Sequence, residues 1–126
     1  MRVLSGKYKN REIKSISDNS VRPTPSSIKK SLFQILEPFN GKKILDLFAG
    51  TGSLGIEALS RNALKTTFVE KDKRIFKVLS SNLDRLCHKH EYEIINMDVF
   101  SYIKKCSTKY DIIFADPPYE TVDFND

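Results

Sequence analysis

The sequence predicts an α/β fold in which a parallel sheet carries helices on both faces. From residue 43 onward, short apolar segments alternate with amphipathic ones, a pattern typical of repeated βαβ units. A glycine-rich stretch follows the first apolar segment directly, at the end of a strand where α/β proteins bind ligands. The 126 residues suffice for one domain, and 40% of them are hydrophobic, which is enough to build a core.

The βαβ region is expected to contain four strands and three helices. The strands are predicted at 43–48, 66–70, 92–96 and 110–115, and the helices at 53–61, 73–86 and 99–106. The second of these helices has the clearest pattern, because leucines and isoleucines recur along it at helical spacing. Asp72 stands where it can cap the N-terminus of that helix.

The first 42 residues have a different character. Segments 3–8 and 11–16 flank a turn at Lys9-Asn10 and predict a β-hairpin, and a polar linker follows at 17–23. A helix is then expected, with Thr24 as its cap, Pro25 in its first position, and an end before Pro38. Its expected apolar stripe is formed by Ile28, Leu32, Ile35 and Leu36. We therefore divide the single domain, 1–126, into an arm, 1–23, and a helix plus core, 24–126.

Charge is distributed unevenly along the chain. The net charge is +5, and residues 1–43 hold ten Lys or Arg against three acids, whereas the remainder holds eleven against thirteen. This distribution favours an arm that faces a polyanion on a domain that binds a small molecule. A surface that merely keeps the protein in solution is the alternative.

Several protein classes are disfavoured. No apolar run approaches the roughly 20 residues of a membrane-spanning helix, and the N-terminus turns polar too early for a signal peptide. Cys87 and Cys106 lie far apart, which argues against a disulfide framework or a cysteine-based zinc site. A reduced, cytoplasmic protein with no metal and no membrane association is expected.

The strongest local motif is Asp46-Leu47-Phe48-Ala49-Gly50-Thr51-Gly52, where a strand passes through glycines into a helix. The glycines permit a tight turn and a close approach to a ligand, and the helix offers free N–H groups. Because no Gly-Lys-Ser/Thr follows, a Walker A loop is excluded. A dinucleotide, S-adenosylmethionine and a turn without a ligand remain open at this point.

Acidic residues end the next two strands. Glu70 closes the second strand, where a carboxylate can accept hydrogen bonds from ribose hydroxyls, and Asp98 follows the third, where it can reach an adenine amino group. Each acid alone could equally be a helix cap or a surface group. Their shared position at the carboxyl edge of a parallel sheet favours a ligand site.

The tetrapeptide Asp116-Pro117-Pro118-Tyr119 follows the fourth strand directly. It combines an acidic acceptor, a carbonyl held by proline geometry and an aromatic plane. This combination suits a planar substrate whose amino group donates hydrogen bonds while its ring stacks on the tyrosine. A plain turn at the end of a strand is the alternative.

In this order, the four motifs resemble those of amino-group methyltransferases that depend on S-adenosylmethionine. The segments Gly6–Arg11 and Arg22-Pro23-Thr24 are similar to the RsmD-type family, which methylates a guanine N2 in 16S ribosomal RNA. The resemblance extends from residue 1 to about residue 119. It implies a Rossmann-like class I methyltransferase fold, S-adenosylmethionine as cofactor, the small ribosomal subunit or its assembly intermediate as partner, and a monomeric full-length protein.

Two alternatives to this function stay open. DNA adenine-N6 methyltransferases share the tetrapeptide, and a chain that binds cofactor or RNA without turnover is also conceivable. The family continues well past the tetrapeptide, with three further strands in its sheet. We therefore expect either a longer natural protein or a dimer or strand swap that covers the outer edge of the fourth strand.

The resemblance also implies roles for individual residues. Asp116 and the Pro117 carbonyl would hold the target amino group, while Tyr119 stacks on the base. The basic side chains of the arm would grip RNA phosphates, and Tyr8 either stacks on a base or packs within the arm. The implied cofactor-binding residues are Asp46, Phe48, Ala49, Gly50, Thr51, Gly52, Glu70, Lys71, Asp98 and Val99. The implied RNA-binding residues are Arg2, Lys7, Lys9, Arg11, Lys14 and Arg22.

Overall fold

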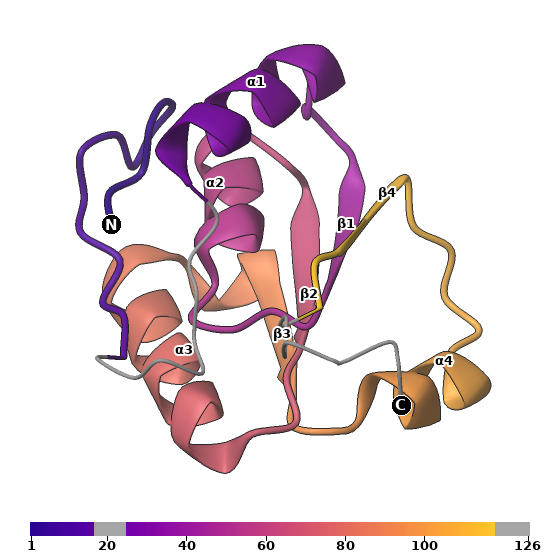
Figure 1. The fold of residues 1–126 in the computed structure, drawn as a ribbon. Coiled ribbons are helices and arrows are strands. Elements are labelled where there is room, and N and C mark those ends of the chain that lie inside the picture. The colour runs from indigo at the N-terminus through magenta and orange to yellow at the C-terminus, as the bar shows by residue number, and fades with distance from the viewer. Residues whose placement is uncertain (17–24, 118–126) are drawn as a thin grey trace, which may run out of the picture.

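A computed structural model describes residues 1–16 and 25–117 and shows a four-stranded sheet between two helical layers (Figure 1). The elements are, in order, α1 (Ser26–Leu36), β1 (Lys43–Leu47), α2 (Ser53–Ser60), β2 (Lys65–Val69), α3 (Lys73–Leu86), the 3₁₀ turn η1 (Lys89–Glu91), β3 (Tyr92–Ile95), α4 (Val99–Lys105) and β4 (Ile112–Ala115). The predicted βαβ region is confirmed to within a few residues at each end. The Asp72 side chain caps α3 by accepting from the N–H groups of Arg74 and Ile75, as expected.

The sheet is parallel throughout, with strand order β3-β2-β1-β4. Because all four strands run in the same direction, their carboxyl ends meet at one edge, where a ligand site is expected. β4 is an outer strand of the described sheet, and Ile113 on it is 56% exposed. No helix in the described part of the chain is long and apolar enough to cross a membrane.

The two faces of the sheet are covered by different helices. Ile44, Phe68 and Phe114 face α1, α2 and α3 in the larger core, which also takes in Val3 and Ile13 from the N-terminal segment. On the other face, a smaller cluster of Leu45, Leu47 and Val69 packs against Val99 of α4. Figure 1 shows α4 on the opposite side of the strands from the three longer helices. The prediction of helices on both faces is therefore confirmed.

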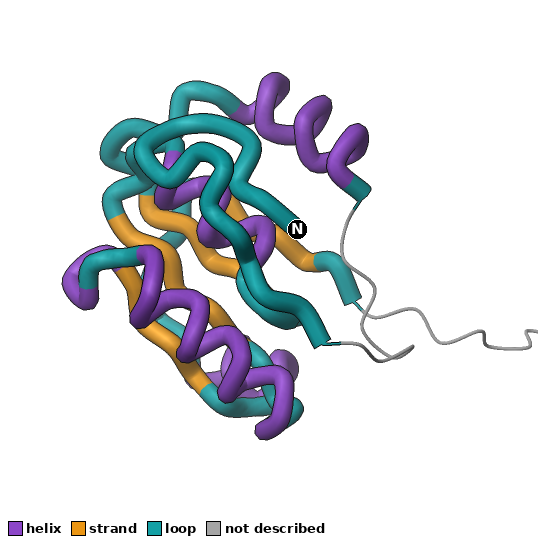
Figure 2. The backbone as a smooth tube through the Cα atoms, turned by 90° about the vertical axis from the view of Figure 1, so that its left-hand side faces the viewer, coloured by secondary structure: helices purple, strands orange, loops and turns teal. Residues whose placement is uncertain are grey.

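The predicted N-terminal β-hairpin is confirmed only in part, because its two segments pair antiparallel but form no extended strands. Within residues 1–16, the two segments share a single antiparallel bridge, Arg2 to Glu12, and the turn occupies residues 5–10 instead of two residues. The loop is closed by N–H groups of Val3 and Asn10, which donate to the carbonyls of Arg11 and Val3 at 3.0 and 2.9 Å. Figure 2 shows this segment without strands, lying over α2. The segment also packs against helices, and its N–H groups at Leu4, Ser5 and Tyr8 bond to side chains of α2.

The prediction for the first helix needs two corrections. α1 begins at Ser26, so Pro25 occupies the cap position instead of the first helical one, and Thr24 lies outside the described residues. The expected apolar stripe is also partly wrong, because Ile28 is 57% and Ile35 is 79% exposed. The face that packs on the core instead presents Phe33, which contacts the rings of Phe39 and Phe114.

The burial of α2 explains why α1 and the N-terminal segment sit where they do. Glu57 in the middle of α2 is fully buried, and its carboxylate lies 3.2 Å from the ammonium of Lys29, which is itself fully buried on α1. The same carboxylate accepts from the N–H groups of Leu4 at 2.8 Å and Ser5 at 3.1 Å. The Arg61 guanidinium also donates to the Glu57 carboxylate, at 2.9 Å.

The Glu57 carboxylate therefore ties three separate segments together in the interior. Burial lowers the pKa of Lys29, and the adjacent Glu57 carboxylate works in the opposite direction by favouring the charged ammonium. Ser60, one turn further along α2, fixes the same segment by accepting from the Tyr8 N–H at 2.9 Å and donating to the Ser5 carbonyl at 2.6 Å. The N-terminal segment is thus built into the core through polar contacts of α2.

Removing the charge of Glu57 should destabilise the whole domain. In Glu57→Gln the buried Lys29 ammonium loses its countercharge, and an amide N–H₂ faces backbone donors, so we expect a loss of about 3–5 kcal/mol in the free energy of unfolding. Denaturant unfolding measures the change. As a control, Glu93→Gln breaks the exposed 3.8 Å pair with Lys65 and should cost about 0–1 kcal/mol. Equal effects of the two substitutions would contradict the role assigned to Glu57.

Candidate functional site

The turn between β1 and α2 lies at the carboxyl edge of the sheet. Gly50 and Gly52 have φ values of +59° and +100°, as the glycine-rich motif predicts. A Cβ placed at Gly50 would meet nothing within 4 Å, so this part of the loop borders open space. The loop is held from behind, because the Ala49 N–H donates to the Val69 carbonyl at 3.0 Å.

Glu70 is fixed beside this loop. One carboxylate oxygen accepts from the Gly50 N–H and the other from the Asp72 N–H, both at 2.9 Å. The side chain is mostly buried, yet each carboxylate oxygen can accept a second bond. Glu70, the predicted ribose acceptor, thus contacts the glycine loop and can still accept further hydrogen bonds. Its neighbour Lys71 is exposed, and the Lys71 carbonyl accepts from Asn96 at 3.0 Å.

Asp46 lies beneath the loop as a buried acid. Its carboxylate accepts from the Gly55 N–H at 3.1 Å, at the start of α2. Burial raises the pKa of Asp46 well above the usual range of aspartate, and the nearby carboxylates of Asp116 and Glu70 raise it further. The structure therefore brings together acids from the ends of β1, β2 and β4. A ligand that carries positive charge would favour the ionised form of these carboxyl groups.

Asp98 and Val99 stand at the third strand end, but their contacts are local. Asp98 is exposed and caps α4 by accepting from the Ser101 N–H at 3.0 Å, which is the alternative considered for a lone acid. Val99 is buried in the smaller core. The ring of Phe48 meets that of Phe100 edge-on with centroids 6.5 Å apart, which joins the glycine loop to the start of α4. Sequence reasoning missed this aromatic pair.

The start of the Asp116-Pro117-Pro118-Tyr119 tetrapeptide lies at the same edge of the sheet. Asp116 and Pro117 are exposed directly after β4, and β4 pairs in register with β1. Tyr119 lies outside the described residues, so its predicted stacking role is not addressed by the structure. Thr51, the remaining loop residue, is buried, and its carbonyl accepts a hydrogen bond from Asn82 of α3 at 2.9 Å.

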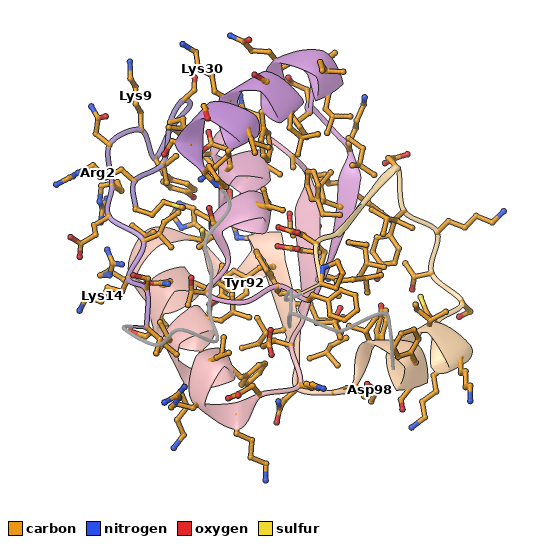
Figure 3. All side chains as sticks on the ribbon, in the orientation of Figure 1. Arg2, Lys9, Lys14, Lys30, Tyr92 and Asp98 are labelled. Carbon is orange, nitrogen blue, oxygen red and sulfur yellow. The ribbon has the colours of Figure 1, made fainter. Side chains whose placement is uncertain are left out.

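The basic side chains of the N-terminal segment gather on one side of the molecule. Arg2, Lys9 and Lys14 point outward along this side in Figure 3, with Lys30 of α1 above them. Arg11 is exposed as well, whereas Arg22 lies outside the described residues. Lys30 was not predicted as part of this face, because only the folded chain brings α1 beside the N-terminal segment.

Lys7 and Tyr8 are engaged within the protein. The Lys7 ammonium pairs with the carboxylate of Glu91, and the Tyr8 hydroxyl donates to the same carboxylate at 2.8 Å. Tyr8 is 9% exposed and packs in the larger core, so its ring is not free to stack on a base. Burial and the bond to Glu91 raise the pKa of Tyr8 above that of a free tyrosine.

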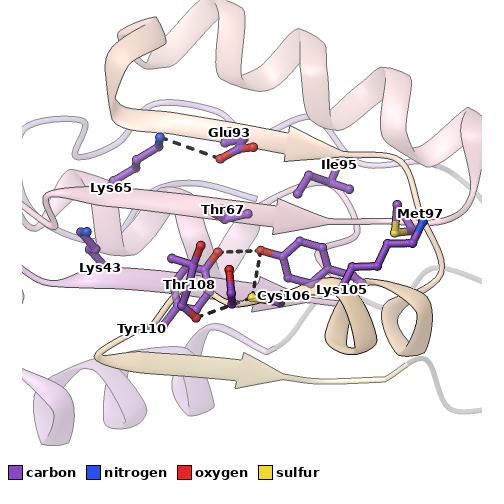
Figure 4. A pocket seen from close by; sticks show the side chains of 12 residues that line it. Lys43, Lys65, Thr67, Glu93, Ile95, Met97, Lys105, Cys106, Thr108 and Tyr110 are labelled. Atoms are coloured by element: carbon purple, nitrogen blue, oxygen red, sulfur yellow. Dashed lines mark hydrogen bonds and ion pairs between the residues drawn. The ribbon is translucent and has the colours of Figure 1, made fainter.

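A separate hollow of about 400 Å³ lies on the α4 face of the sheet (Figure 4). Its walls include Tyr102 and Tyr110, whose hydroxyls are 2.6 Å apart, and the thiol of Cys106, which lies 3.6 Å from the Tyr102 hydroxyl. The residues predicted to bind cofactor or substrate do not line it. Within residues 1–16 and 25–117, no group of three or more His, Cys, Asp or Glu side chains is arranged to hold a metal ion.

Comparisons with known proteins place the chain in a family. A family model described as "Conserved hypothetical protein 95" matches residues 1–126. The chain is also 37% identical over 123 residues to Ribosomal RNA small subunit methyltransferase D of Haemophilus influenzae, covering 94% of this chain and 64% of that protein. The chain belongs to this RsmD family. The resemblance inferred from the motifs is therefore confirmed.

Other relatives and solved structures agree. The protein of the same name from Buchnera aphidicola subsp. Baizongia pistaciae is 39% identical over 123 residues, which cover 96% of this chain and 62% of that protein. The structure of yhhF from Escherichia coli, provisionally assigned as a methyltransferase, matches with a TM-score of 0.84 and 30% identity, over 96% of this chain and 65% of that one. The chain thus spans a little under two thirds of the length of these family members.

A third similar structure was solved with a bound ligand. SMU.776, another provisionally assigned methyltransferase, was solved as a complex with SAH, and it matches with a TM-score of 0.63 and 29% identity. The match covers 73% of this chain and 25% of that one. The expected Rossmann-like class I methyltransferase fold is confirmed by these structural matches together with the sheet order.

Neutralising Asp46 should stabilise the protein in a pH-dependent way. A carboxyl whose pKa is raised by folding opposes folding above its unfolded pKa of about 3.9, and this penalty grows as pH rises toward the folded pKa. Asp46→Asn, which retains an acceptor for Gly55, should therefore raise the melting temperature at pH 7.5 by more than at pH 5. Calorimetric melting at both values measures this. A gain independent of pH, or a loss that grows with pH, would contradict the burial of a disfavoured charge.

Proposed function

We propose that the chain binds S-adenosylmethionine at the carboxyl edge of the sheet and transfers its methyl group to the exocyclic N2 of a guanine in small-subunit (16S) ribosomal RNA. The observation that carries this proposal is the clustering of Asp46, Glu70 and Asp116 beside an open glycine loop. Membership of a family whose relatives are named small-subunit RNA methyltransferases supplies the substrate class.

The charge of the site suits this cofactor. S-adenosylmethionine carries a sulfonium and an ammonium, and acids at three strand ends would stabilise both. Glu70 retains acceptor capacity for ribose hydroxyls, and the partial positive charge at the N-terminus of α2 favours the methionine carboxylate. Asp98 and the backbone at Val99 are proposed to border the adenine, next to the aromatic pair of Phe48 and Phe100.

Asp116 and the Pro117 carbonyl are proposed to receive the amino group. The N2 lone pair of guanine is delocalised into the ring, so two acceptors that draw its protons out of plane make it more nucleophilic. The cofactor, when bound, supplies a methyl group on a positively charged sulfur. The N2 lone pair forms the new bond to carbon as the carbon–sulfur bond breaks, and the surplus proton on N2 leaves to solvent. Asp116 offsets the positive charge that develops on nitrogen.

The exposed cations of the N-terminal segment support RNA as the substrate. Arg2, Lys9 and Lys14 lie on one side with Lys30, and Arg11 of the same segment is exposed. Such side chains can contact a phosphate backbone without reading sequence. The target base must leave its stack to reach Asp116, and RNA loops and junctions permit this at low cost. Lys7, which Glu91 engages, is proposed to position the segment instead of contacting phosphate.

The proposal is tested by transfer of a labelled methyl group from S-adenosylmethionine to isolated small ribosomal subunits and to duplex DNA. We expect label in the RNA and none in the DNA. Asp116→Asn should reduce transfer by at least about 100-fold while the affinity for S-adenosylhomocysteine stays within a few-fold, because Asp116 is assigned to the target base. Label on DNA adenine, or no cofactor binding by the unaltered chain, would contradict the proposal.

The exposed cations should set the salt dependence of RNA binding. Replacing Lys9, Arg11 and Lys14 together by Ala should lower the log–log slope of affinity against salt by about 0.7–0.9 for each phosphate that the variant no longer neutralises. The control replaces Lys104, Lys105 and Lys109, which are exposed near α4 and carry the same total charge. Filter binding over a salt series measures both slopes. Equal slopes for the two triple variants would show that the N-terminal segment contributes only bulk charge.

A further inference from the structure

One buried side chain of α3 joins the basic N-terminal segment to the glycine loop. Asn82 is 0% exposed. Its amide nitrogen donates to the Thr51 carbonyl at 2.9 Å, inside the loop, and to the Lys14 carbonyl at 3.0 Å, in the N-terminal segment. Its amide oxygen accepts from the Lys14 N–H at 3.0 Å. Both backbone groups of Lys14 are therefore held by the same amide that holds Thr51.

The hydrogen-bonding capacity of this amide is saturated. Arg85 donates to the amide oxygen at 3.0 Å, so the two donors and two acceptor positions of Asn82 each have one partner. The partners also fix the orientation of the amide, since a flip would turn N–H groups toward the Lys14 N–H and the Arg85 guanidinium. A buried polar group with this arrangement has one favourable position, and displacing it would leave several groups unsatisfied.

Lys14 connects this arrangement to the surface. Its side chain is exposed and points outward on the basic side of the molecule (Figure 3), while its backbone is bonded to Asn82. A phosphate held by the Lys14 side chain therefore restrains the residue whose backbone positions the amide. The amide in turn holds the carbonyl of Thr51, which lies between the two glycines of the loop.

We propose that Asn82 is a positioning residue that couples RNA binding on the N-terminal segment to cofactor binding in the glycine loop. The inference rests on the proposed function. RNA would restrain Lys14 and the cofactor would restrain Thr51, and both residues bond to the Asn82 amide. The ligand that binds second therefore loses less conformational entropy than it would lose alone. The coupling is positive and reciprocal: bound RNA raises the affinity for cofactor, and bound cofactor raises the affinity for RNA by the same factor.

The test measures the affinity of the full chain for S-adenosylhomocysteine by calorimetry, with and without saturating small-subunit ribosomal RNA. We expect RNA to tighten binding of the unaltered chain by a factor in the range of about 5–150. Asn82→Asp keeps the shape and the acceptors but turns carboxylate oxygens toward the carbonyls of Lys14 and Thr51. In this variant the factor should fall close to one, even where RNA still binds.

The matched control is Ser60→Ala. Ser60 anchors the N-terminal segment on α2 and does not contact the glycine loop, so loosening the segment there should leave most of the coupling factor in place. Lys14→Ala provides a second route if Asn82→Asp does not fold, because deleting the exposed side chain should reduce the factor without disturbing the buried amide.

The outcomes separate this inference from the function on which it rests. If the unaltered chain binds neither S-adenosylhomocysteine nor RNA, the proposed function fails. If it binds both but RNA leaves the cofactor affinity unchanged, the coupling inference is overturned while the function stands. A full coupling factor in Asn82→Asp, or in Lys14→Ala where the first variant does not fold, also overturns it, as does an equal loss of coupling in Ser60→Ala.

Discussion

The structure depends on a carboxylate that lies in the interior of the protein. Glu57 receives the ammonium of Lys29 at 3.2 Å, two backbone N–H groups of the N-terminal segment and the guanidinium of Arg61. A buried charge is tolerated only when partners replace the water it has lost. In this protein two segments distant in sequence supply partners, and Arg61, one turn further along the chain, supplies another. The carboxylate therefore fixes α1 and the N-terminal segment relative to α2.

Through α2, the Glu57 carboxylate also positions the candidate ligand site. The helix that carries Glu57 begins at the glycine loop, and the Gly55 N–H near its start donates to Asp46 at 3.1 Å. The same short helix thus holds the N-terminal segment at one end and borders the acids of β1, β2 and β4 at the other. Burial of residues Leu54 to Ser60 on all sides leaves it little freedom to move. The basic surface and the acidic site are parts of one packed unit.

Much of the sheet region follows from local sequence. Short segments are enough to predict the alternation of strands and helices, the Asp72 cap and the glycine turn, because periodicity and capping are local properties. Glu70 could be placed beside the loop for a similar reason, since parallel strands end at a common edge. Asp46 is predicted because its motif resembles that of the family, and its burial and raised pKa could not be foreseen.

The N-terminal third is less predictable because its partners are distant. Two short segments around a Lys9-Asn10 turn predict a hairpin, but they share a single bridge. Further backbone groups of the segment bond to Glu57, Ser60 and Asn82 on two helices. On α1 the apolar residues Ile28 and Ile35 face outward, while a lysine is buried. Isoleucines are usually buried and lysines exposed, so the sequence alone would not predict this arrangement. It is explained by Glu57, which lies opposite Lys29 in the folded chain.

Native-state hydrogen exchange at the N-terminal amides tests most directly whether this segment is part of the core. The N–H groups of Leu4, Ser5 and Tyr8 bond to Glu57 and Ser60, so they should exchange only through global unfolding, as slowly as the amides of β1 and β2. Protection of the strand amides together with fast exchange at these three positions would show that the N-terminal segment opens on its own. That result would contradict the conclusion that Glu57 and α2 hold the basic surface and the acidic site together as one packed unit.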